Sequence, residues 1–128
     1  MRLVSDPRFG EVDLAGSADE LAGLADAVAE GEGFLACEPL PEGNGLTGIS
    51  VRTTSEPGVR IELDSGLRAL VISGDAESRG VLGRNLRTMA MAEDGGHLHV
   101  DYFPEHPYLL EGSLPLVVSG PHGGMPAR

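Results

Sequence analysis

Two segments of the chain share one pattern, and this pattern constrains the fold more than any other feature of the sequence. Leu14–Asp19 (LAGSAD) aligns with Ile72–Glu77 (ISGDAE) at a constant offset, and the apolar positions that follow also align. In each segment a strand-like run ends at a glycine, and a residue suited to cap a helix comes next. Convergence on a common strand-to-helix junction would give the same match. The pattern favours two strand–helix halves that share one sheet, with both helices packed on one face so that every apolar face is covered.

The first half predicts two short strands and a helix. Leu3 and Val4 begin one strand, and Glu11–Ala15 alternates polar with apolar residues as a strand with one buried face does. Ser17 and Glu20 have the spacing of a capping box, so a helix is expected from about Ala18 to Glu30. The stretch 33–46 is rich in glycine and proline and predicts a loop, with Phe34–Cys37 docking on the core before it.

Three strands are expected next, arranged as a meander. Residues 49–53 and 59–63 alternate around the turn residues Ser55–Gly58, which predicts a hairpin. A second tight turn at Asp64–Gly66 leads into 67–72, whose nearly continuous apolar run is typical of a central strand or of one covered on both faces.

A second helix and two more strands complete the expected fold. Asp75 is placed to cap a helix from about Ala76 to Ala92 that ends at Gly95 and Gly96, followed by a strand over 97–102 and a short one over 114–118. The fold class is α+β, with a mostly antiparallel sheet of about five to seven strands and two helices packed on one face. We expect a single domain over 1–119 and a flexible tail over 120–128.

Composition limits the compartment and the kinds of partner. Cys37 is the single cysteine among 128 residues, and the sequence has neither a secretory leader nor an apolar run long enough to span a bilayer, so a cytoplasmic location is expected. A net charge of −11 disfavours binding to nucleic acid or to an anionic membrane, because both require a basic footprint.

The negative charge is concentrated in the first third of the chain. Between Phe9 and Val51 there are nine carboxylates and no basic residue. The expected first helix carries three of them, Asp19, Glu20 and Asp26, which are candidates for contact with a basic protein partner. A solvated surface that serves solubility alone is the alternative interpretation.

The residues His97, His99 and Asp101 form a candidate metal site. Alternation along a strand places all three on one face, and imidazole with carboxylate suits Zn²⁺ or another divalent ion. A strand whose other face is apolar needs a polar outer face in any case, so a solvated face or a partner contact explains the same residues.

Three of the five aromatic residues gather near the C-terminal end of the sequence. These are Tyr102, Phe103 and Tyr108, with two prolines between Phe103 and Tyr108. Prolines hold a segment extended at low entropic cost, and aromatic residues anchor many binding hot spots. Packing of the segment onto the end of the sheet is the alternative. The sequence contains no recognised catalytic motif, and no cofactor is expected.

The same region resembles a known family. Gly96–Leu109 (GHLHVDYFPEHPYL) with Ser113–Val118 (SLPLVV), together with Asp6–Val12 (DPRFGEV), is similar to the immunity protein 32 family of bacterial polymorphic toxin systems. The resemblance implies an α+β protein that neutralises a cognate toxin in the producing cell, without catalysis or cofactor. The glycine- and proline-rich stretch 31–48 departs from the family pattern and is interpreted as an insertion.

Three functions are compatible with these observations. The first is a stoichiometric inhibitor that occludes a protein toxin, with the acidic helix steering the association with a basic partner. The second is a metal-binding module or metal-dependent enzyme that uses His97, His99 and Asp101. The third is an oligomeric accessory domain that pairs through an open sheet edge, for which a homodimer is the simplest form.

Overall fold

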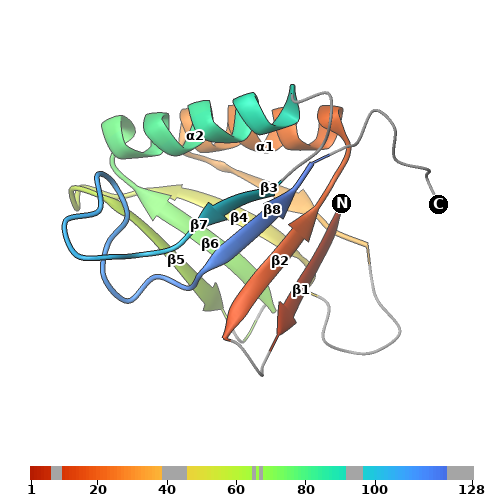
Figure 1. Cartoon of the computed structure of the whole chain (residues 1–128), viewed down its shortest axis with the longest axis horizontal. Helices are drawn as coiled ribbons and strands as arrows, with labels where there is room; N and C mark the ends of the chain where they lie inside the picture. Colours follow the sequence, from red (N-terminus) through yellow and green to blue (C-terminus); the bar gives the residue numbers. More distant parts are fainter. Residues whose placement is uncertain (7–9, 39–45, 65, 67, 92–96, 121–128) are drawn as a thin grey trace.

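The chain folds into ten elements in the same order twice: strand, strand, helix, strand, strand (Figure 1). The structure is a computed structural model that describes residues 1–6, 10–38, 46–64, 66, 68–91 and 97–120. The first half contains β1 (Arg2–Asp6), β2 (Glu11–Ala15), α1 (Ala18–Glu30), β3 (Gly33–Ala36) and β4 (Gly48–Thr53). The second half contains β5 (Val59–Asp64), β6 (Ala69–Gly74), α2 (Ala76–Ala90), β7 (His97–Val100) and β8 (Leu116–Ser119).

The two halves exchange strand pairs. One four-stranded sheet has the order β1-β2-β8-β7, and the other has the order β3-β4-β6-β5. The outer pairs are antiparallel, whereas the central pairs, β2 with β8 and β4 with β6, are parallel. Each half therefore supplies one strand pair to each sheet, and neither sheet is complete without both halves.

The strand registers repeat between the halves. Leu3 pairs with Leu14 in the first half, and at the offset of the sequence repeat Ile61 pairs with Ile72. The parallel pairs are also equivalent, because Val12 lies opposite Leu116 in one sheet, and Leu70, the counterpart of Val12, lies opposite Ile49 in the other. Even the hairpin turns match, with a positive φ of 66° at Gly10 and 54° at Arg68. The short sequence repeat therefore marks an approximate two-fold relation of the whole fold.

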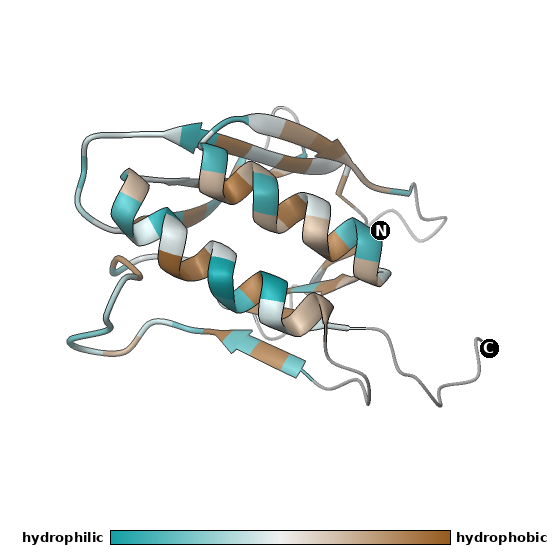
Figure 2. Cartoon of the chain, turned by 90° about the horizontal axis from the view of Figure 1, so that it is seen from above, coloured by the Kyte–Doolittle hydropathy of each residue, from teal (hydrophilic) through white to brown (hydrophobic). Residues whose placement is uncertain are grey.

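Local sequence determines where the helices begin and end. The Ser17 hydroxyl accepts the Glu20 N–H at 3.1 Å and the Glu20 carboxylate accepts the Ser17 N–H at 2.9 Å, which completes the predicted capping box. Gly31 ends α1 in the left-handed conformation with φ of 88°. Asp75 stands at the N-cap position of α2, as predicted, but its side chain makes no capping hydrogen bond and accepts the Gly58 N–H at 3.0 Å instead. The two helices lie side by side along the strands, with apolar and polar residues alternating along each (Figure 2).

Both sheets and both helices contribute to one hydrophobic cluster. The predicted stripes of α1 (Leu21, Leu24, Ala25, Val28) and α2 (Leu82, Leu86, Met89) are buried. Strand β6 lies between β4 and β5, and its first four residues are buried on both faces of the sheet. The prediction of a central strand covered on both sides is thus confirmed, as is the α+β class.

Three predicted features of the strands differ in the structure. The prediction of a hairpin between 49–53 and 59–63 is wrong, because β6 lies between β4 and β5 and pairs in parallel with β4. The predicted three-stranded meander is therefore not formed. Phe34–Cys37 does not dock as a loop, since Gly33–Ala36 forms strand β3 against β4. The strands form two mixed sheets of four rather than one sheet.

Two sequence predictions fall on parts of the chain that are not described. Gly95 and Gly96, expected to end the second helix, lie outside the described residues, and α2 ends at Ala90 with Met91 as its C-cap. The expected tail lies outside them as well, apart from Gly120.

Candidate protein-binding surface

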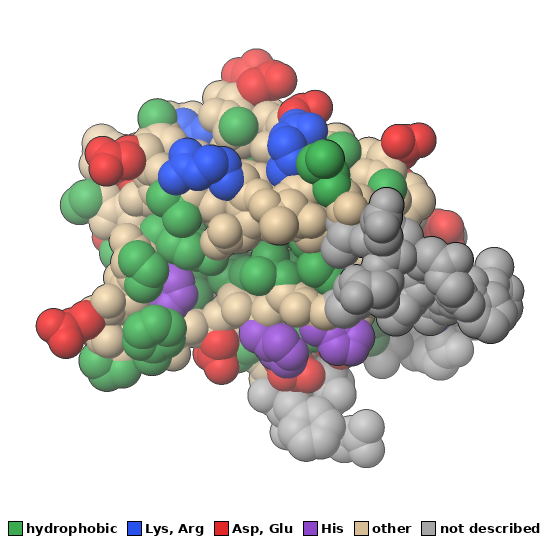
Figure 3. All heavy atoms as spheres, turned by 45° about the horizontal axis from the view of Figure 1, so that its top comes forward, with side chains coloured by type: hydrophobic (Ala, Val, Ile, Leu, Met, Phe, Trp, Pro, Cys, Tyr) green, Lys and Arg blue, Asp and Glu red, His purple; other side chains and the backbone are tan. Residues whose placement is uncertain are grey.

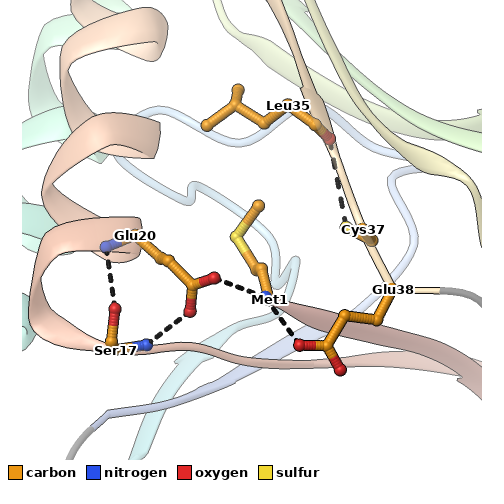
Figure 4. Close-up of polar contacts among 6 residues, drawn as sticks. All are labelled: Met1, Ser17, Glu20, Leu35, Cys37 and Glu38. Atoms are coloured by element: carbon orange, nitrogen blue, oxygen red, sulfur yellow. Dashed lines mark hydrogen bonds and ion pairs between the residues drawn. The ribbon is translucent and has the colours of Figure 1, made fainter.

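Two of the three predicted partner-binding carboxylates on α1 make contacts within the chain. Besides closing the capping box, the Glu20 carboxylate accepts the Met1 ammonium at 2.6 Å (Figure 4). These bonds, first to the ammonium and then to the Ser17 N–H, hold the pKa of the Glu20 carboxyl below its ordinary value. Asp26 forms an ion pair with Arg87 of α2. Asp19 is exposed in the first turn of α1.

The acidic stretch is therefore less uniform in space than in sequence. Helix α2 lies against α1, and on the face drawn in Figure 3 arginine side chains gather over the helices near acidic ones. The cross-helix pair of Asp26 with Arg87 removes part of the single-sign character that the sequence suggested. The charge of α1 alone does not define a binding surface.

The His97, His99 and Asp101 set lies on β7 and just beyond it. The two imidazole rings meet edge to face with centroids 6.3 Å apart, and Nδ1 of His97 lies 3.3 Å from the Ser119 hydroxyl. Within the described ranges, no group of three or more histidine, cysteine or carboxylate side chains is arranged to hold a metal ion. The structure gives the predicted metal site no support.

The aromatic residues of the segment 101–110 differ in their exposure. Tyr108 is 8% exposed and belongs to the core, and Tyr102 is partly buried against the core. Phe103 is 54% exposed. The rings of Phe103 and Tyr108 each lie 4.7 Å from that of His106, measured between centroids. Of the three predicted contact residues, only Phe103 offers a largely free apolar surface.

His106 organises this segment through its ring nitrogen. Nδ1 of His106 accepts the backbone N–H groups of Tyr108 at 3.2 Å and Leu109 at 3.0 Å. An acceptor nitrogen must be unprotonated, so these bonds favour the neutral ring. Burial lowers the pKa of His106 from its ordinary value, and the charge of Asp101 opposes that shift.

The segment after His106 covers the outer edge of strand β5. The Val59 N–H donates to Tyr108 O at 2.7 Å and Val59 O accepts the Leu110 N–H at 2.8 Å, while Leu114 N–H reaches Ile61 O at 2.9 Å. These bonds satisfy main-chain groups that an edge strand otherwise presents to solvent. The packing interpretation therefore accounts for most of this segment.

Two described residues, Glu38 and Leu46, bond to β1, the counterpart of β5. The Glu38 N–H donates to Met1 O at 3.0 Å and the Leu46 N–H donates to Leu3 O at 3.0 Å. Glu38 and Leu46 flank the middle of the glycine- and proline-rich stretch that was interpreted as an insertion. Glu38 and Leu46 thus bond to the edge of β1 as residues 108–114 bond to the edge of β5.

The remaining outer strands are β3 and β7, which occupy corresponding positions at the far ends of the two sheets. Within the residues described, neither strand has a hydrogen-bonded neighbour on its outer side. Phe34 of β3 is 56% exposed and is one of the largest apolar side chains on the surface. The sequence prediction missed this edge, because the surrounding glycines and prolines indicated a loop.

A surface hollow of about 280 Å³ lies beside the start of α2, between Asp75, Glu77, Ser78 and the chain 106–110. Hydrogen bonds from the Ser78 hydroxyl and the Gly58 N–H lower the pKa of the Asp75 carboxyl. The Asp75 carboxyl is therefore ionised at neutral pH, and its charge suits a basic side chain.

The single cysteine is half-buried against the core. The Cys37 thiol lies 4.0 Å from Leu35 O, and burial raises its pKa (Figure 4). A raised pKa disfavours the thiolate and gives no sign of a reactive nucleophile. Among the described residues, no helix is long and apolar enough to cross a membrane.

Comparison with known proteins agrees with the resemblance found in the sequence. Residues 69–121 match the family model described as Immunity protein 32. No curated protein and no solved structure matches the chain. The matched segment spans β6, α2, β7 and β8, together with the chain that covers the edge of β5. The predicted resemblance to the immunity protein 32 family is thereby confirmed, on the evidence of these residues.

Proposed function

We propose that the chain is a non-catalytic binding protein that neutralises a cognate toxin of a bacterial polymorphic toxin system in the cytoplasm of the producing cell. The match of residues 69–121 to the immunity protein family carries this proposal. The net charge of −11 adds to it, since a strongly acidic protein associates fastest with a basic partner.

Inhibition by this protein is stoichiometric. It binds the toxin and occludes the toxin's working surface, so it requires neither a catalytic group nor a cofactor. Exposed carboxylates such as Asp19 accelerate encounter, and apolar groups such as Phe34 and Phe103 supply contact area that excludes water.

Co-expression tests the proposal directly. Each toxin domain encoded beside this gene is expressed in a host with and without the chain. We expect growth to be restored for one domain, and the two proteins to purify together at a 1:1 ratio. A co-expressed unrelated acidic protein of similar size is the control. If the chain rescues growth from none of the neighbouring toxin domains, the proposal fails.

The salt dependence of the association rate tests whether charge steers the toxin to this protein. The association rate with the rescued toxin should fall steeply between low and physiological salt, and also in the triple variant Asp19→Asn, Glu20→Gln, Asp26→Asn. Glutamine at position 20 keeps the capping box, so the helix is retained. Equal rates under all these conditions would show that α1 plays no part in steering.

A further inference from the structure

We propose that the outer edge of β3 is the docking site for the protein partner, which adds an extended, positively charged segment as a fifth strand of the β3-β4-β6-β5 sheet. The identity of that partner as a toxin rests on the proposed function, whereas the docking mode rests on the geometry and charge of β3. Strand β3 lies outside the family-matched residues, so these observations are independent of the match.

The main-chain groups of two β3 residues face outward. Cys37 N–H donates to Thr47 O at 2.9 Å, which makes Cys37 and Thr47 a hydrogen-bonded pair facing β4. Bonding alternates along an antiparallel ladder, so Leu35 and Gly33 also face β4. The N–H and C=O groups of Phe34 and Ala36 consequently point away from the sheet. No described residue bonds to them.

This edge lacks the features that protect edge strands. The sequence of β3, Gly-Phe-Leu-Ala, contains no charged residue and no proline, and its pairing with β4 has no bulge. Residues 108–114 cover the edge of β5, and Glu38 and Leu46 bond to β1, whereas in the described part of the chain nothing bonds to the outer side of β3. Phe34 is 56% exposed and its ring lies over Gly48, where it forms an apolar contact beside the free main-chain groups.

Charge identifies the kind of occupant. Exposed carboxylates flank β3 on both sides, with Glu30 and Glu32 before it and Glu38 after it. Against them stand Arg52 on β4 and the Met1 ammonium, which lies 3.8 Å from the Glu38 carboxylate. A second copy of the chain pairing at this edge would bring two such clusters together, which repulsion disfavours. A basic strand is complementary. The other free edge, β7, carries His97 and His99 instead of carboxylates.

A synthetic peptide provides the probe. We would titrate ¹⁵N-labelled protein with a blocked seven-residue peptide of alternating lysine and valine and follow the amide resonances. Binding should shift the Phe34 and Ala36 signals and slow their hydrogen exchange. Ala36→Pro removes one outward N–H without touching the bonds to β4, and should weaken binding about tenfold. His99→Pro, on the other outer strand β7, is the control and should leave binding unchanged.

Changes to the peptide keep the test valid if Ala36→Pro impairs folding. N-methylation of alternate peptide residues removes their hydrogen-bond donors, and replacing lysine with glutamate reverses the charge; each should abolish binding to the unaltered protein. No binding of the basic peptide, or shifts that lie on β7 or α2 instead of β3, would overturn the proposal. Since the probe is not a toxin, this result is separate from the growth rescue that tests the proposed function.

Discussion

At the scale of single residues, Arg79 is the most demanding side chain to accommodate. It is 3% exposed, and its guanidinium donates to Gly74 O at 2.8 Å, Val28 O at 2.8 Å and Ala29 O at 3.0 Å. Two of these carbonyls lie in the last turn of α1, which has no basic residue of its own. A cation from α2 therefore satisfies the negative end of the α1 dipole and links the two halves.

Replacing this guanidinium should be costly. Arg79→Met keeps much of the apolar stem but leaves three carbonyl groups without their donors, so we expect the free energy of unfolding to fall by about 3 kcal/mol. Urea denaturation measures this. Arg84→Met, on the exposed side of the same helix, is the control and should change stability by less than about 0.5 kcal/mol. Equal effects of the two variants would refute the role assigned to Arg79.

His106 makes stability depend on pH. Because its folded-state pKa lies below the unfolded value of about 6.5, the unfolded chain takes up the proton first. The contribution of His106 is thus complete above about pH 6.5 and is lost as pH falls through the folded-state pKa. His106→Asn keeps an acceptor for the Tyr108 and Leu109 N–H groups but does not titrate. Between pH 7 and 5 it should lose less stability than the parent protein in thermal melts. Parallel losses in both proteins would contradict this assignment.

At the scale of elements, the glycines of α2 report how closely the helices approach. A Cβ built on Gly83 would lie 3.3 Å from Ala25 O on α1, whereas at Gly80 the nearest atom is the end of the Arg84 side chain at 3.8 Å. Gly80→Ala should stabilise the protein by about 0.5–1 kcal/mol through helix propensity. Gly83→Ala should gain less or destabilise, because the backbone of α1 must shift. Equal gains in denaturant melts would mean that the helices do not touch at Gly83.

The elements also show which features the sequence can predict. The bounds of α1 and its capping box follow from local patterns, and both were predicted because Ser17, Glu20 and the apolar spacing interact within one helix. Alternation along 49–53 and 59–63 identified the buried residues Ile49, Val51, Val59 and Ile61, although Thr53 and Leu63 are exposed, and it did not specify which strands pair. The structure places β6 between them, a contact between residues distant in sequence. Pairing of this kind leaves no local signal.

The binding surface was harder to predict than the fold. Tyr108 is of a residue type that is common at binding interfaces, but it packs in the core. Glu20 carries a charge that could steer a basic partner, but its carboxylate completes the capping box of α1. Both have intramolecular roles that depend on neighbours known only from the structure. The free edge of β3 was not predicted, because whether a strand lies at the edge of a sheet depends on the strand order. Four apolar or small residues form an edge strand only when no other strand pairs beside them.

At the scale of the whole molecule, the exchange of strand pairs makes the two halves mutually dependent. Each sheet joins its halves through a central parallel pair, and Arg79 of the second half binds carbonyls of the first. Neither half alone can complete a sheet or cover its helix, so the conformational entropy of ordering one half is offset only when the other is present. Folding should therefore be a single cooperative transition, without a stable state in which one half is folded.

Cutting the chain between the halves tests this dependence. The exposed loop 54–57 joins β4 to β5, so fragments 1–56 and 57–128 separate the halves without interrupting a strand. Each fragment alone should give the narrow amide dispersion of an unfolded chain in NMR spectra at micromolar concentration. An equimolar mixture should recover the native spectrum as a 1:1 complex. A fragment that folds by itself, or a mixture that stays unfolded, would show that the exchanged strand pairs do not hold the molecule together.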